Sequence, residues 1–354
     1  MAGGLARRVA MVAEARAANP GAVYIDLGGQ GVQPAPRPLI ARTLAALEPA
    51  AVGAGPDDLL ELAPWADLPL TSLTPPTTGP APPASRVVEA GGVKVAVLSV
   101  AFGPLTTREL ADQAATAIAA RRAEGCAVAV LLSHLSATST ERLVDRLPAA
   151  DRPHLVALAT DADEPGDPYE KLGATWVPLA HKGRSLATVR LVPAADGWAV
   201  EVEQRLVDEG PVDPEVQAWV DAYHAAQAVT AVAASPSPYP RPSACLPCHE
   251  PAVTAWRGHA HGRAVATLEA AGRLTPDCLP CHDERYRREQ VRSAPPDAGV
   301  ECATCHGGLA AHLADSATPT TPATDCLTCH TPEHSPAWDA PRYCAAVTAV
   351  CAPG

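Results

Sequence analysis

The chemistry of this chain is concentrated between residues 245 and 330, where the sequence Cys-x-x-Cys-His occurs four times. Each copy is a signature of covalent c-type haem attachment, because two thiols at this spacing can add to the two vinyl groups of one haem. The histidine that follows is carried beneath the ring, where it binds the iron. We therefore expect four haem c groups. They would be held by Cys245, Cys248, Cys278, Cys281, Cys302, Cys305, Cys326 and Cys329, with His249, His282, His306 and His330 as iron ligands.

Zinc is the alternative metal, because four Cys-x-x-Cys pairs could build two four-cysteine sites. Zinc gives no reason for a histidine directly after every second cysteine, yet all four copies have one. The repeated histidine therefore favours haem.

The amino-acid composition limits which residue types can be the distal ligand of each iron. Methionine, which raises the potential of many cytochromes c, occurs only at Met1 and Met11. Histidine remains, so we expect low-potential haems with two histidine ligands, one haem lacking a distal ligand. If residues 251–271 form one helix, His259 and His261 are separated by about 200° around its axis, so they would serve two different haems. Either of these two histidines could instead be an ordinary surface histidine. The candidates are His259, His261, His312 and His334.

A basic cluster follows the second motif. Its arginines would bind haem propionates or form a solvated helix face. They are Arg285, Arg287, Arg288 and Arg292.

Charge and hydropathy limit the partners. The formal net charge of −12 argues against nucleic acid or an anionic membrane surface as partner. An acidic surface suits redox partner proteins, as it suits simple solubility. No run of about 18 apolar residues exists, so we expect no membrane span. The sequence leaves the oligomeric state open.

Residues 1–19 predict an amphipathic helix rather than a signal peptide, because Arg7, Arg8 and Glu14 interrupt any apolar run. Haem attachment of this type takes place outside the cytoplasmic membrane. We therefore expect a periplasmic or otherwise exported protein whose signal has been removed or whose start is missing.

The elements that precede the motifs form an α/β domain over residues 1–210. Helices are predicted at 5–18, 38–48, 107–124 and 138–147, the last with a capping box at 138–141. Turns of β-hairpins are predicted at 91–92 and 182–184. Strands are predicted at 22–27, 93–101, 127–132, 155–160, 175–179, 185–192 and 198–203.

Residues 211–243 hold a helix and a stiff Pro/Ser linker. From 244 to 354 periodicity fades, apart from short helices at 251–271 and 283–292. This last domain is expected to be mainly α and irregular, with haems in place of a conventional core.

Residues 244–354 resemble the tetrahaem cytochrome c-554 family. The first motif is followed by Trp256-Arg-Gly-His-Ala-His-Gly, similar to that family's tryptophan and distal-histidine segment, which implies His261 as a ligand. His312, six residues after the third motif, matches a further distal ligand. A histidine usual near the end of the last segment is absent, with Ala349 near its place.

Residues 1–210 resemble the 5′-nucleotidase type of calcineurin-like metallophosphoesterase, which implies a sandwich of that family. The likeness lies in three segments, Ala22–Gly29, Ala51–Asp58 and Val130–His134. Four metal-binding segments of that family are changed or absent. The opening Asp-x-His is missing, and Gly29 stands where the family has its bridging Asp. Residues 56–57 replace the family's Asn-His pair, and Ala159–Asp163 replaces its Gly-His-x-His segment.

His134 and Asp58 cannot build a two-metal site alone. The resemblance thus implies a degenerate, non-catalytic domain. Three hypotheses follow: an electron carrier, a redox enzyme acting on a small nitrogen or oxygen species at a five-coordinate haem, and a phosphoesterase with a cytochrome domain.

Overall fold

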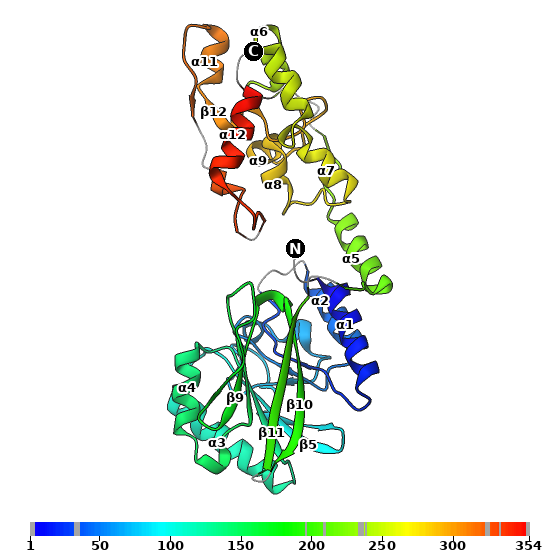
Figure 1. Ribbon diagram of the computed structural model, residues 1–354, viewed down its shortest axis with the longest axis vertical. Coiled ribbons are helices and arrows are strands. Elements are labelled where there is room, and N and C mark those ends of the chain that lie inside the picture. Colours follow the sequence, from blue (N-terminus) through cyan, green and yellow to red (C-terminus); the bar gives the residue numbers. More distant parts are fainter. Residues whose placement is uncertain are drawn as a thin grey trace. The chain divides into compact units, whose positions relative to one another are not determined.

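The computed structural model describes residues 4–31, 36–194, 197–207, 210–232, 237, 239–322, 326–332 and 334–351. The chain divides into two compact units, Ala2–Val220 and Asp221–Gly354, which are drawn in Figure 1. No helix within the described ranges is long and apolar enough to cross a membrane.

A six-stranded mixed sheet forms the centre of the first unit. The four strands β5, β6, β7 and β9 run parallel, and antiparallel strands β4 and β8 close the two edges. In spatial order the strands are β4 (Ser85–Ala90), β5 (Val93–Val100), β6 (Val128–Ser133), β7 (Leu155–Ala159), β9 (Ala174–Leu179) and β8 (Tyr169–Lys171).

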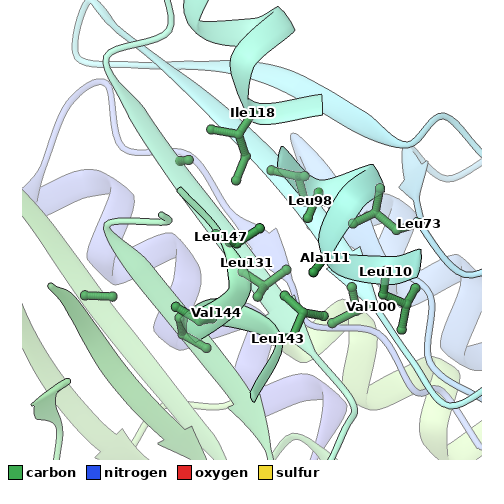
Figure 2. Packing of buried hydrophobic residues seen from close by; sticks show 14 of the residues in the cluster. Leu73, Leu98, Val100, Leu110, Ala111, Ile118, Leu131, Leu143, Val144 and Leu147 are labelled. Carbon is green, nitrogen blue, oxygen red and sulfur yellow. The ribbon is translucent and has the colours of Figure 1, made fainter. Parts of the chain in front are cut away.

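Alternate residues of the central strands pack on opposite faces of this sheet. Leu98 and Leu131 point toward α3 (Thr107–Ala123) and α4 (Ala137–Arg146), where they meet Leu143 and Val144 (Figure 2). Val97 and Val130 belong to a second cluster on the other face, with the hairpin β10 (Ser185–Ala194) and β11 (Gly197–Leu206). Both faces are covered, which is why the sequence of β6 is apolar without interruption.

A small parallel sheet completes the unit: β1 (Ile25–Asp26), β2 (Ala51–Gly53) and β3 (Leu70–Thr71). Helices α1 (Leu5–Ala18) and α2 (Arg37–Ala46) pack on it through Val12 and Leu44, together with Trp65. Two 3-10 turns, η1 (Asp58–Leu60) and η2 (Ala63–Trp65), connect β2 to β3.

Two local predictions in this unit are wrong. The N-cap of α4 is Ser136, whose hydroxyl accepts a hydrogen bond from the Ser139 amide, and the capping box belongs to Thr106 and Glu109 of α3. The segment 182–184 is no hairpin turn, because η4 (His181–Gly183) leads from β9 to β10, which lie in different sheets. The predicted hairpin turn at 91–92 is confirmed between β4 and β5.

The second unit is built from short helices and irregular segments. Among its described residues, the apolar cluster consists of buried Leu268, Leu279 and Tyr286, with Val229, Leu274 and Cys278 partly buried against them. The chain enters it through α5 (Pro214–Ala226). Its further elements are α6 (Pro242–Gly258), η5 (His261–Arg263), α7 (Ala264–Ala270), α8 (Leu279–His282), α9 (Glu284–Glu289), α10 (Cys302–Cys305), β12 (His306–Gly307), α11 (Leu309–Ala314), β13 (Thr321–Pro322), η6 (Cys326–Thr328) and α12 (Ala340–Cys351).

The single helix predicted over 251–271 is broken. Helix α6 ends at Gly258 and α7 begins at Ala264, and the backbone of His259 is extended, with φ −78° and ψ 159°. The pair His259 and His261 therefore lies in a turn, so their angular separation around a helix does not apply.

Candidate haem-binding site and the degenerate metal site

All four haem motifs lie on or at the end of a helical segment. The two cysteines of each copy are three residues apart: the first pair lies within α6, the third spans α10, Cys278 directly precedes α8, and Cys329 directly follows the 3-10 turn η6. Residues at this spacing lie on the same side of a helix, so both thiols can face one ring. In two copies the backbone leaves the helix at the histidine itself: His249 has φ −125° and ψ 38°, and His306 has φ −119° and ψ 114°.

Two pairs of imidazoles are brought together from distant parts of the chain. The ring centroids of His249 and His312 are 6.0 Å apart, and those of His261 and His330 are 6.2 Å apart. Two metal–imidazole bonds of about 2 Å, with half a ring width at each end, give roughly 6 Å between the centroids of two imidazoles on one metal. Both pairs therefore fit two ligands of one iron.

Hydrogen bonds prepare these rings for a metal. Nδ1 of His312 lies 2.8 Å from the Thr318 carbonyl oxygen, and Nδ1 of His282 lies 3.2 Å from that of Ala264. A carbonyl only accepts, so each Nδ1 carries the proton and Nε2 keeps its lone pair. Nδ1 of His330 lies 2.9 Å from the Ser335 hydroxyl, which can donate or accept, so this contact orients the ring without setting its tautomer.

His261 is neutral. Burial, and then the neighbouring His259 and His330, lower its pKa to about 4. The neutral imidazole is the form that binds a metal.

His259 is used differently. Its Nδ1 accepts a hydrogen bond of 3.3 Å from the backbone amide of His261. Accepting there places the proton of the neutral ring on Nε2, which leaves no lone pair for an iron. His334 is exposed, and within the described ranges it has no ring contact with another histidine. The structure thus brings His261 and His312 to a haem motif, and it places neither His259 nor His334 in such a pair.

Thiols of different motifs are neighbours. The thiol of Cys302 donates a hydrogen bond to Cys245, which lowers the pKa of Cys245, and Cys329 hydrogen-bonds Cys281. Burial raises the pKa of Cys329. The first motif therefore lies beside the third, and the second beside the fourth.

A backbone clamp fixes the turn that carries His261. The indole of Trp256 donates to the Val300 carbonyl over 2.8 Å, and the Val300 amide donates to the His261 carbonyl over 3.0 Å. A Cβ on Gly262 would lie 2.1 Å from the Trp256 oxygen, within the turn itself, and one on Gly299 would lie 2.5 Å from the His261 oxygen. Gly262 thus permits the tight turn, and Gly299 permits the contact between this turn and the segment before Cys302.

The predicted basic cluster is neutralised within the protein. Arg287 and Arg288 bind Glu284, which is 2% exposed, and Arg285 binds Glu289. Glu284 also accepts a 2.7 Å hydrogen bond from Thr304, inside the third motif. These arginines therefore join the second motif to the third, and three of the four are committed to protein carboxylates. The fourth, Arg292, donates to the Val229 carbonyl.

The three metallophosphoesterase-like segments do converge in the first unit, but their polar groups satisfy one another. The amides of Gly29, Gln30 and Gly55 donate to the Asp58 carboxylate at 2.7, 3.0 and 2.9 Å. Nε2 of His134 lies 2.8 Å from the Leu27 carbonyl oxygen and donates to it.

Both groups are buried, which raises the pKa of Asp58 and lowers that of His134. Across the described ranges, no group of three or more His, Cys, Asp and Glu side chains could hold a metal ion.

A polar cluster of His181, Asp163 and Arg184 was not predicted from the sequence. His181, after β9, lies 2.8 Å from Asp163, after β7, and Arg184 also binds Asp163. Both histidine and carboxylate follow the carboxyl ends of parallel strands, where α/β sheets bind ligands. Their position just after two predicted strands is the feature of the sequence from which this cluster could have been predicted.

Comparison with known proteins divides the chain in the same way. Residues 244–307 match the family model described as cytochrome c554 and c-prime, a range that holds three of the four haem motifs. No curated protein sequence matches significantly.

Solved structures are similar to the first unit. The sulfate thiohydrolase SoxB of Thermus thermophilus, in complex with glycerol, aligns with a TM-score of 0.53 at 18% identity, covering 64% of this chain and 47% of that one. A 5′-nucleotidase precursor, also from Thermus thermophilus, aligns with a TM-score of 0.50 at 18% identity, covering 65% and 55%. This chain thus spans about half the length of either structure. The N-terminal unit has the mixed α/β fold of these metallophosphoesterases, and in this chain it is fused to a cytochrome c554-like region.

Proposed function

We propose that this protein is an exported multihaem c-type cytochrome that passes electrons between redox partner proteins through four haems. The observation that carries the proposal is the placement of His312 opposite His249 and of His261 opposite His330, at centroid distances of 6.0 and 6.2 Å. Each haem, when bound, supplies a one-electron redox centre. The N-terminal domain would occupy 1–210, the helix and linker 211–243, and the cytochrome domain 244–354.

The chain's own residues divide the work of holding these groups. The paired cysteines of each motif would bind the vinyl groups, and the histidine after them the iron. His312 and His261 would complete the coordination for the first and fourth motifs. Because thiols of the first and third motifs touch, as do those of the second and fourth, the attached groups would lie close enough together for electrons to pass between them.

Haem counting tests the proposal. The chain, joined to an export signal, is matured in a host that attaches haem c, and haem per polypeptide is measured by alkaline pyridine absorption and by intact mass. We expect four haems per chain and stepwise reduction at low potential. Protein that emerges from a competent host without haem, or with zinc bound to the cysteines, would refute the function.

A second function is favoured by one observation. Among the described residues, neither His282 nor His306 has an imidazole partner, and the chain has no lysine after Lys182 and no methionine after Met11. Haems on the second and third motifs would then offer a position to a small nitrogen or oxygen species. Cyanide or nitric oxide should perturb the absorption of part of the haem population, and unchanged spectra would exclude this function while leaving electron transfer intact.

A further inference from the structure

Two arginines of the second unit, Arg257 and Arg292, have a buried Nε atom without a hydrogen-bond acceptor among the described residues, but Arg292 still donates from Nη1 to the Val229 carbonyl. Arg257, at the end of α6, is half-buried, and its Nε atom is buried without any hydrogen-bond acceptor among the described residues. Arg257 differs in that its side chain has no hydrogen bond or ion pair at all among the described residues, whereas Arg241 binds Glu301 and Arg285 binds Glu289. A buried donor that is left unpaired destabilises the protein, and more so when the group is charged.

The surroundings of Arg257 are fixed on both sides and open beside it. Trp256 is anchored to Val300, and the His259 amide donates to the Trp256 carbonyl over 2.9 Å. A Cβ on the adjacent Gly258 would meet no atom within 4 Å. These contacts hold the backbone on either side of Arg257, and the adjacent Gly258 faces open space.

The location of that turn indicates the ligand. Arg257 lies four residues before His261, across the break at the end of α6, and its Cα would be 3.1 Å from a Cβ on Gly262. His261 in turn faces His330. A guanidinium group binds carboxylates with two parallel hydrogen bonds, and the carboxylates of a haem are its propionates. Resting on the proposed function, we infer that Arg257 binds a propionate of the haem held by His330 and His261.

The test is a spectroelectrochemical titration of the four-haem protein. An unpaired propionate keeps its negative charge beside the iron and favours the ferric state. In R257Q we expect one of the four potentials to fall by about 60 mV, a tenfold change in the one-electron equilibrium constant. That potential should also become more dependent on pH, because the freed carboxyl group can take up a proton. R257K keeps the positive charge but not the two parallel N–H donors, so its potential should fall less. R263Q changes an exposed arginine and should leave all four potentials unchanged.

Four potentials that match those of the wild type in R257Q would overturn the inference, as would equal shifts in R257K and R257Q, which would indicate packing rather than charge. If R257Q binds fewer than four haems, the titration of R257K decides. Four haems with one potential lowered by less than about 60 mV would support the inference. Unchanged potentials, or loss of haem from R257K as well, would oppose it. Wild-type protein that binds no haem would instead refute the proposed function.

Discussion

His330 shows how one imidazole can be prepared for a metal from both ends. Its Nδ1 meets the Ser335 hydroxyl, its ring stacks on Trp338 at 4.3 Å, and its other side faces His261. Such contacts hold the ring plane before a ligand binds. His259 lacks this arrangement, although it is only two residues from His261.

The distal ligands give a prediction with an internal control. H261A and H312A should each convert one haem from low-spin to high-spin, because each removes one of two imidazoles from an iron. H259A should leave all spin states unchanged, because its Nδ1 serves the backbone. Electron paramagnetic resonance of the ferric protein measures the change, and a new high-spin signal in H259A alone would contradict the assignment.

Burial of His134 predicts an acid-sensitive fold. The pKa of His134 is lowered by burial, so below its ordinary value of about 6.5 the unfolded chain binds a proton that the folded chain refuses. Unfolding then takes up protons, and the free energy of unfolding should fall as pH drops below about 6.5, by at most about 1.4 kcal/mol per pH unit.

Thermal or urea unfolding of the full chain at pH 7.5 and 5.5, followed by far-ultraviolet circular dichroism, measures this effect. H134Q should lose the dependence. Asp58 acts with the opposite sign, because its raised pKa makes the folded chain the better proton acceptor. A steeper loss of stability in H134Q would contradict the role of His134.

At the scale of elements, the turn between α6 and α7 depends on the absence of a side chain at Gly262. G262A would force its methyl group to within 2.1 Å of the Trp256 carbonyl oxygen, a backbone atom that cannot rotate away. We expect a loss of about 1–3 kcal/mol together with disturbed coordination by His261. G258A, four residues earlier and facing open space, is the matched control and should be close to neutral. Equal stability of the two variants in urea titrations would contradict the clamp.

The strands of the first unit could be predicted because they combine apolar runs with short turns. The predicted strands 93–101, 127–132 and 155–160 agree with β5, β6 and β7 to within one or two residues. Strand β4 was missed, since its buried and exposed residues follow no clean alternation. Predicting the break between α6 and α7 required the contact with Val300, which lies 44 residues from Trp256.

The candidate haem site divides in the same way between local and long-range information. The attachment residues follow from spacing alone, and His261 and His312 follow from the resemblance. Their assignment to particular motifs could not be read from the sequence, because His261 faces His330, 69 positions away. The arginines after the second motif were ambiguous for the same reason, since their partners are set by folding.

For the whole molecule, the contrast between the two units predicts where activity is found. The first unit has the mixed α/β fold of the metallophosphoesterase structures, but Asp58 and His134 are already bonded to the backbone. The protein should not hydrolyse nucleotide esters when manganese or zinc is added. Turnover above that of a D58A/H134A double variant, measured as released phosphate, would show that the site can reopen.

The contacts between thiols of different motifs bear on how the protein is made. Oxidising compartments favour disulfides, and neighbouring thiols exchange most readily. In a folded chain without haem, bonds between Cys245 and Cys302 and between Cys281 and Cys329 would remove one attachment point from every motif. Disulfide formation and haem attachment would then compete for the same sulfur atoms. If the proposed function holds, the chain would have to meet haem while its thiols are reduced, so the timing of haem delivery would matter as much as the sequence.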